Sequence, residues 1–228
     1  KTLCGIAEGI AKVDFSGEDL NAPDAVLLSF DLEVNRALTA LDVLFNDLGD
    51  GSAALAGAVS GHQQIKMFCE IPVKQLRDDT LTELDLNGKD IDTCGAMVLA
   101  HLLEFSRALT SVNLLENGIG DGAAAVVAAA KQHGNIKTLC GMEEGKEEAD
   151  FEEWGLDAAD AVLLSFDLEF NRALKSANLA ANHIGDEGAI AISTALENNN
   201  TLTEIDLNGR DSAVKIGNAG AQAIAKML

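Results

Sequence analysis

The segment LTELDLNGK at residues 81–89 decides the fold, because it places three leucines in the pattern LxxLxL directly before an Asn-containing turn. The last two of these leucines, Leu84 and Leu86, alternate with polar residues, as the apolar residues of a half-buried strand do. We therefore expect a short strand whose leucines point into the protein. The residues expected to point outward are Glu83, Asp85 and Asn87.

The same kind of segment recurs along the chain. Related segments begin at residues 10, 38, 109, 146, 174 and 202, and several neighbours are 28 residues apart. A longer duplication accompanies this period, since DAVLLSFDLEVNRAL at 24–38 returns as DAVLLSFDLEFNRAL at 160–174. A fixed period of this length is typical of a repeat protein, in which each repeat is one supersecondary unit.

A helix is expected after each strand of the long repeats. The turn reads GIGDG at 118–122 and HIGDEG at 183–188, and GAIAISTAL at 188–196 has apolar residues at helical spacing. Pro23 suits the first turn of a helix, where its missing N–H has no partner to lose. One strand and one helix cannot bury their apolar sides alone, so the units are expected to stack.

These features predict an α/β solenoid, a horseshoe or arc with a parallel β-sheet on the concave face and helices on the convex face. We expect one domain over residues 1–228 with about nine units, either part of a longer chain or capped by partners. The units near 65–80 and 136–145 are too short for a helix and are expected to be strands with a tight return. A four-residue excess at 210–216 is expected to form a loop.

The recurring strand motif, IGD turn and Ala/Leu-rich helix resemble leucine-rich repeats of the ribonuclease-inhibitor-like type. The resemblance covers nearly the whole chain. It implies a non-enzymatic protein–protein interaction scaffold, which we expect to be a subunit or adaptor of a larger multiprotein assembly. It also leaves open an alternative, a regulator that inhibits a ribonuclease or activates a GTPase through an acidic concave face.

The chain is strongly acidic, with 37 acidic and 16 basic side chains, a formal net charge of −21 and a pI near 4.3. This excess argues against nucleic-acid binding, which needs a basic patch. No apolar run is long enough to span a bilayer and the first 15 residues lack the pattern of a signal peptide, so we expect an intracellular protein, in the cytoplasm or an organelle interior. The four cysteines form neither a disulfide framework nor a CxxC pair and are expected to stay reduced.

One residue of each strand, between its two inward apolar positions, is expected to lie on the concave surface. Most of these residues are acidic, which predicts a groove that attracts a basic protein by long-range electrostatics. The alternative is that Asp and Asn are common at this position and only solvate the sheet. In the two short units this position holds Cys69 and Cys140. The predicted concave contacts are Asp14, Asp42, Glu83, Asp85, Asn113, Glu148, Asp150, Asn178, Glu204 and Asp206.

The helices carry few charges at the positions expected to face outward, three and six residues after the first helical position. We predict that this apolar convex surface docks on another protein, since contiguous exposed apolar patches mark interaction sites. The alternative is that neighbouring helices bury these positions. The predicted convex contacts are Leu27, Phe30, Val98, Leu163 and Phe166.

No motif places a nucleophile beside a base, because GxSxG, HExxH and paired Cys and His are all missing from the sequence. The glycines at 118–122 lack the Lys-Ser/Thr of a phosphate loop, and the acidic stretch at 143–153 lacks the spacing of a calcium loop. We therefore predict no catalytic residue, no cofactor and no metal.

Overall fold

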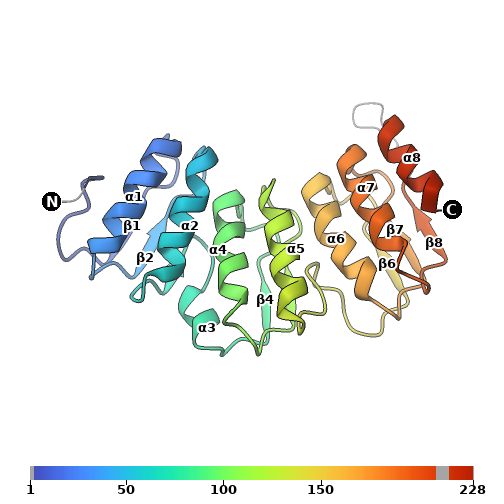
Figure 1. The fold of residues 1–228 in the computed structure, drawn as a ribbon, viewed down its shortest axis with the longest axis horizontal. Coiled ribbons are helices and arrows are strands. Elements are labelled where there is room, and N and C mark those ends of the chain that lie inside the picture. The colour runs from blue at the N-terminus through green and yellow to red at the C-terminus, as the bar shows by residue number, and fades with distance from the viewer. Residues whose placement is uncertain (1–2, 209–215, 228) are drawn as a thin grey trace.

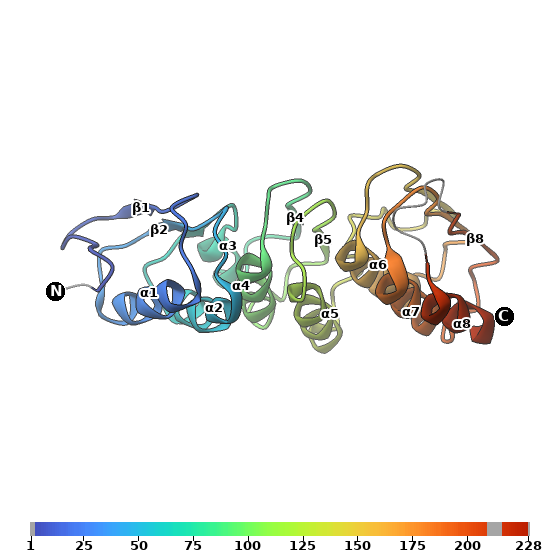
Figure 2. The ribbon, with the colours of Figure 1, turned by 90° about the horizontal axis from the view of Figure 1, so that it is seen from above.

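The computed structural model describes residues 3–208 and 216–227 of the chain. It has two layers: the long helices stand side by side along one face, and the short strands line the other (Figure 1, Figure 2). The elements follow one another along the molecule in the order of the sequence. The predicted α/β solenoid is therefore confirmed.

The strands are two or three residues long and pair in parallel within three sheets. Equivalent apolar residues lie opposite one another, as Val13 does to Leu41 and Leu84 to Val112, so the repeats stack in register. The sheets consist of β1 (Lys12–Asp14), β2 (Ala40–Asp42) and β3 (Met67–Phe68); of β4 (Glu83–Asp85) and β5 (Ser111–Asn113); and of β6 (Glu148–Asp150), β7 (Ser176–Asn178) and β8 (Glu204–Asp206).

The two longest helices begin with the same capping box. The side chain of Asn21 accepts the backbone N–H of Asp24, and the Asp24 carboxylate accepts that of Asn21, so two donors at the helix start are satisfied. Asp157 and Asp160 do the same at the second of these helices. The helices are α1 (Ala22–Val34), α2 (Ser52–Gly61) after a 3-10 turn (Gly49–Gly51), α3 (Val73–Arg77), α4 (Thr93–Leu103), α5 (Gly122–His133), α6 (Ala158–Phe170), α7 (Gly185–Leu196) and α8 (Asn218–Met227).

The two short units interrupt the sheet. The prediction that the unit near 65–80 is too short for a helix is wrong, because it contains the five-residue α3. The helix fits because the chain reverses at once after β3: Cys69 has a left-handed φ of 50°, and Ile71 donates its N–H back to the carbonyl oxygen of Phe68. The unit at 136–145 has no helix and joins β5 only through isolated bridges. The loop predicted at 210–216 lies outside the described residues except for Ile216.

Asparagines that are buried or half-buried close the turns that follow the strands. Asn117 donates from Nδ2 to the carbonyl oxygens of Leu86 and Leu114 at 2.8 and 2.9 Å, and its Oδ1 accepts the N–H of Ile91 at 2.9 Å. Asn46 and Asn182 make the equivalent bonds in their own units. The recurring Asn of the sequence motif is therefore a structural residue that ties one unit to the one before it.

Candidate protein-interaction surface

Acidic side chains form two rows on the strand face. In the third sheet Glu148 and Glu204 lie on either side of Ser176, and Asp150 and Asp206 lie on either side of Asn178. In the second sheet Glu83 is paired with Ser111 and Asp85 with Asn113. A neutral residue therefore separates like charges, which are destabilising when they lie directly opposite each other.

The first sheet departs from this pattern. Asp14 and Asp42 lie directly opposite each other, and the row beside them holds Lys12, Ala40 and Met67 instead of acids. The predicted acidic groove is consequently most acidic over β4 to β8. All ten predicted concave residues are exposed or half-buried, although their role in binding stays a prediction.

The row that holds Asp or Asn at the last residue of each strand also shapes the strand ends. The Oδ1 atom of Asp85 accepts the N–H of Asn87 at 3.1 Å, and that of Asn113 accepts the N–H of Leu115 at 3.3 Å. Asp14 binds both the N–H and the hydroxyl of Ser16, and these hydrogen bonds lower the pKa of its carboxyl group. Either an amide or a carboxylate makes this turn, so the turn accounts for the Asp/Asn preference but not for the charge.

Cys69 and Cys140 do not lie on the concave surface, so their predicted exposure is wrong. Both are buried, because Cys69 sits in the left-handed turn after β3 and Cys140 lies where the short unit folds against β5. Burial raises the pKa of both thiols far above the ordinary value. Both thiols are therefore protonated at neutral pH, unlike the activated thiolate of a nucleophilic cysteine.

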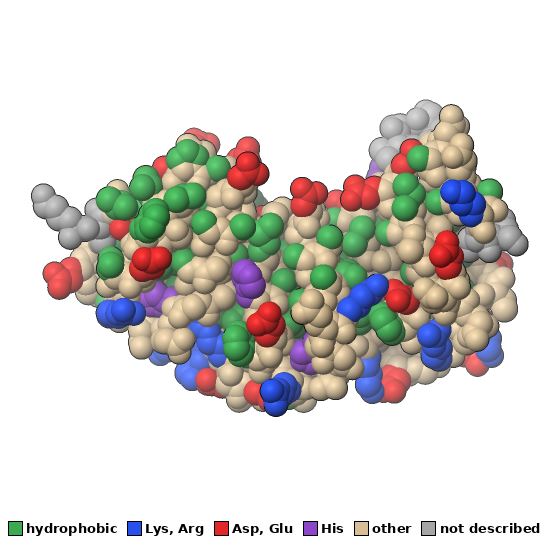
Figure 3. All heavy atoms as spheres, viewed as in Figure 1, with side chains coloured by type: hydrophobic (Ala, Val, Ile, Leu, Met, Phe, Trp, Pro, Cys, Tyr) green, Lys and Arg blue, Asp and Glu red, His purple; other side chains and the backbone are tan. Residues whose placement is uncertain are grey.

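The convex prediction is also wrong in part. Val98, Leu163 and Phe166 are buried between neighbouring helices, with at most 2% of the side chain exposed. Leu27 and Phe30 of α1 are exposed, and hydrophobic side chains gather over this helix on the helix face of the molecule (Figure 3). Of the five predicted convex residues, only these two, at the N-terminal end of the helix layer, are exposed.

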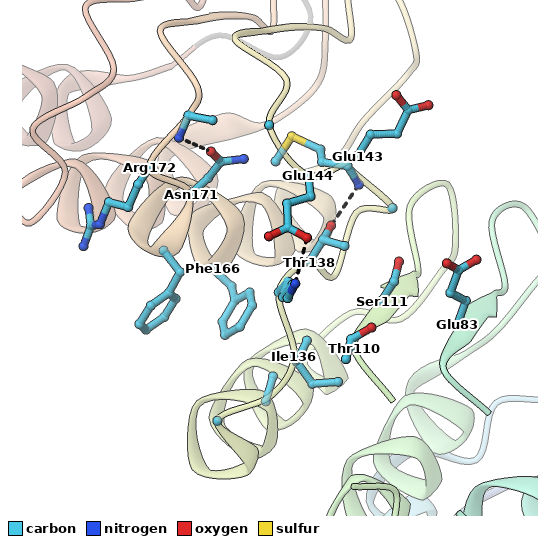
Figure 4. A pocket seen from close by; sticks show the side chains of 18 of the residues that line it. Glu83, Thr110, Ser111, Ile136, Thr138, Glu143, Glu144, Phe166, Asn171 and Arg172 are labelled. Atoms are coloured by element: carbon cyan, nitrogen blue, oxygen red, sulfur yellow. Dashed lines mark hydrogen bonds and ion pairs between the residues drawn. The ribbon is translucent and has the colours of Figure 1, made fainter. Parts of the chain in front are cut away.

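A groove of about 910 Å³ opens where the sheet is interrupted between β5 and β6. Figure 4 shows Glu83 and Ser111 on its strand side and Phe166 and Arg172, from α6 and the turn after it, on the other. Lys137 and Glu144 form an ion pair of 2.7 Å at its rim. The groove therefore lies next to the acidic row that begins at Glu83.

Three buried carboxylates, those of Asp31, Asp160 and Asp167, were not foreseen from the sequence. Asp167 of α6 accepts the hydroxyl of Thr138 and the N–H of Leu139 at 2.7 Å, and burial raises its pKa to about 7. Asp160, at the start of α6, has its pKa raised to about 6, also mainly by burial. Asp31 and Asp167 occupy the same position in the two copies of the duplicated helix, and both are buried.

Comparison with known proteins supports the repeat assignment. A family model described as Leucine Rich repeat matches residues 170–193, from the end of α6 through β7 into α7. No curated protein matches the chain. Among solved structures, a chain titled "Leiomodin-1 Actin-Binding Site 2 (ABS2)" is 23% identical over 69% of this chain and 70% of that chain, with a TM-score of 0.29.

The match to a leucine-rich repeat over residues 170–193 agrees with the α/β solenoid that the structure shows. Within the described part of the chain, no helix is long and apolar enough to cross a membrane. Across those same residues, no group of three or more His, Cys, Asp or Glu side chains is arranged to hold a metal ion. The ribonuclease-inhibitor-like subtype remains a prediction.

Proposed function

We propose that this chain is a non-enzymatic protein-interaction scaffold, a subunit or adaptor of a larger assembly, and that its concave face binds a basic protein. Leucine-rich repeats are a general protein-interaction module, and the acidic rows give this example a specific electrostatic character. The observation that supports the proposal most is the outward placement of Glu83, Asp85, Glu148, Asp150, Glu204 and Asp206 on three strands of one face.

The dimensions of the face suit a protein partner. At the usual spacing of about 4.8 Å, the seven intervals between the eight strands of the described residues span roughly 34 Å, and the two breaks between the sheets lengthen the face further, so it is wide enough for a standard protein–protein interface. The acids lie on a surface of a chain with a net charge of −21, so the local rows and the overall field attract the same partner.

The charge of the rows exceeds what folding requires. Asn113 and Asn178 show that an amide can occupy the turn-forming position, yet Asp stands there in β4, β6 and β8. Glu83, Glu148 and Glu204 lie two residues before that position, outside the turn-forming hydrogen bond. The carboxylates at both positions therefore lie at the surface, where a partner can reach them, whereas the turn-closing Asn117 and Asn182 are buried.

A charge-neutralised variant tests the concave face. The variant combines four substitutions: Glu83→Gln, Asp85→Asn, Glu148→Gln and Asp150→Asn. Its binding to the basic probe protein lysozyme is measured by titration calorimetry at low and high salt. We expect the affinity at low salt to fall about tenfold or more, and the wild-type affinity to weaken as salt screens the attraction.

The matched control neutralises four acids on the helix side: Glu104→Gln, Asp121→Asn, Glu187→Gln and Glu197→Gln, all of them exposed. Both variants change the net charge equally, so only the position of the charge differs. An affinity lowered by less than about twofold in the control supports the concave face. Equal losses in the two variants would show that net charge alone attracts the probe, and would overturn the proposal.

The acidic rows equally suit the alternative of an enzyme regulator, because an inhibitor also needs to hold a basic enzyme. The two functions separate in activity assays. A scaffold leaves ribonuclease activity and GTP hydrolysis unchanged when it is added in excess, whereas a regulator alters one of them and loses the effect in the neutralised variant.

A further inference from the structure

One position in the loops after the strands has a left-handed backbone in unit after unit. It is the third residue after the last residue of the strand, and its φ lies between 58° and 65° in each long unit whose loop the structure describes. In two of these units the residue is glycine, which adopts this conformation at no steric cost. The residues at this position are Gly17, Phe45, Gly88, Glu116, Glu153 and Ala181.

Phe45 is the costly member of this series. A bulky residue with a positive φ is an outlier, and the glycines at 17 and 88 show that the turn itself does not need a side chain. The Phe45 side chain is also 68% exposed, so burial of its ring does not offset the strain. Backbone strain without a structural benefit clusters at functional sites, which makes Phe45 a candidate contact for a partner.

Trp154 lies in the equivalent loop after β6, directly behind the left-handed Glu153. Its side chain is 46% exposed, and its ring stands edge-on to the buried ring of Phe151, with the centroids 5.1 Å apart and the planes at 83°. This geometry is one of the two preferred arrangements of an aromatic pair. The contact therefore holds the exposed part of the indole in one orientation.

Both rings belong to the edge of the molecule at which the strands lead into the helices. These loops run along the upper edge of the view in Figure 1, and acidic side chains recur along the same edge in Figure 3. The exposed Asp47 follows Phe45 by two residues, and the exposed Glu153 directly precedes Trp154. An aromatic ring beside carboxylates suits a guanidinium group, which stacks on the ring while its N–H groups donate to carboxylate oxygens.

We propose that Phe45 and Trp154 are aromatic contacts for arginine side chains of the basic protein that binds the acidic concave face. This assignment rests on the proposed function, because the acidic rows attract the partner whose arginines the two rings then bind. Attraction between exposed charges is long-range and screened by salt, whereas a guanidinium on a ring is a short-range contact. The rows therefore steer association, and the rings favour arginine over lysine.

Phe45→Gly separates a role in binding from a role in folding. Glycine removes the ring and relieves the left-handed strain, so we expect the melting temperature to rise by about 2–4 °C. Binding of the peptide deca-arginine, measured by titration calorimetry, should weaken about two- to fivefold, the range expected of an exposed cation–π contact. Unchanged affinity would overturn the proposal, and so would a lower melting temperature, which would show that the ring stabilises the fold instead.

Phe45→Leu keeps the strain and an apolar side chain but removes the ring. Wild type should bind deca-arginine more tightly than deca-lysine, which carries the same charge, and Phe45→Leu should narrow this preference. Phe105→Leu is the matched control, because Phe105 is 55% exposed and follows the exposed Glu104 but lies just beyond the end of α4, outside the loop edge. An equal change in the two variants would overturn the assignment of the contact to the loop edge.

Trp154 reports on its own contact. The chain has one Trp and no Tyr, so tryptophan emission follows this ring alone. Saturating deca-arginine should quench or shift the emission, and Trp154→Phe, which keeps a ring, should bind the peptide more tightly than Trp154→Leu. Emission that stays unchanged at saturation would overturn the contact at Trp154.

The variant with four neutralised acids distinguishes a failure of this proposal from a failure of the proposed function. Its loss of affinity should shrink as salt is added, whereas the loss in Phe45→Leu should remain a similar ratio at both salt concentrations. Weaker binding in the neutralised variant with unchanged binding in Phe45→Leu and Trp154→Leu would overturn the aromatic contacts alone. Unchanged binding in the neutralised variant would overturn the proposed function, and the present proposal with it.

Discussion

Asn117 donates a hydrogen bond of 2.8 Å to the carbonyl oxygen of Leu86, which lies 31 residues earlier in the chain and one repeat away. The same side chain binds Leu114 of its own unit and accepts the N–H groups of Lys89 and Ile91. Only 5% of Asn117 is exposed, so water cannot replace these bonds. One side chain thus satisfies backbone groups of two consecutive units.

Replacing this residue should destabilise the solenoid strongly. Asn117→Ala leaves several buried backbone groups without partners, and we expect the free energy of unfolding to fall by about 3 kcal/mol. Asn87→Ala removes a bond of 3.0 Å to the carbonyl oxygen of Leu115 from a half-buried residue and should cost about 1 kcal/mol. Urea unfolding followed by circular dichroism measures both. Similar losses in the two variants would contradict the role assigned to Asn117.

The buried Asp167 should make stability depend on pH. Its pKa is raised to about 7 in the folded protein, above the ordinary value of 3.8, so between these values the folded state holds a proton that the unfolded state has released. The stability that this group contributes is present at low pH and lost as pH rises through about 7. The free energy of unfolding should therefore fall by about 2 kcal/mol between pH 5.5 and 8.

Asp167→Asn isolates this effect, because the amide does not titrate. Between pH 5.5 and 8 the melting temperature of wild type should fall relative to that of Asp167→Asn. Glu104→Gln, which removes an exposed charge, is the control, and its difference from wild type should stay nearly constant. A difference for Asp167→Asn that is independent of pH would show that Asp167 does not titrate here.

Strand positions and the outward row of the concave face could be predicted from the sequence, because alternation of Leu with polar residues at a fixed period determines which side of a strand is buried. Burial of the helices could not be predicted in the same way. In the identical segment DAVLLSF, Leu27 and Phe30 are exposed in α1, whereas their counterparts Leu163 and Phe166 are buried in α6, where α5 packs on the helix. A single helix pattern contains no information about that neighbour.

The errors at the short units have a different cause. The expectation for Cys69 assumed that the strand continues, but the chain enters a left-handed turn at that residue and carries the thiol inward. The motif IKMFC gives no local warning, since Cys seldom adopts a positive φ. The helix α3 was missed because a single helical turn after such a reversal needs only five residues.

Close packing of consecutive helices predicts opposite effects for one substitution at two glycines. A Cβ atom on Gly122 would lie 2.6 Å from Cβ of Ala96 and 3.2 Å from the carbonyl oxygen of Thr93, so Gly122→Ala should push α5 away from α4. Gly57 of α2 has open space around it. We expect Gly122→Ala to lower the free energy of unfolding by about 2 kcal/mol, and Gly57→Ala to raise it by about 0.5–1 kcal/mol through helix propensity. The melting temperature should move in the same direction in each variant. Stabilisation by both substitutions would show that the helices can separate freely.

Asp85 separates the structural and electrostatic roles of the concave row. Asp85→Asn keeps an oxygen that accepts the N–H of Asn87, whereas Asp85→Ala removes it. We therefore expect unfolding free energy to be unchanged in Asp85→Asn and lowered by less than about 1 kcal/mol in Asp85→Ala. Binding of a basic probe depends on charge instead of the turn, so both variants should weaken it equally, by about twofold at low salt. If Asp85→Asn binds like wild type and only Asp85→Ala is weakened, the carboxylate serves the turn alone and the charge of the row does not contribute to recognition.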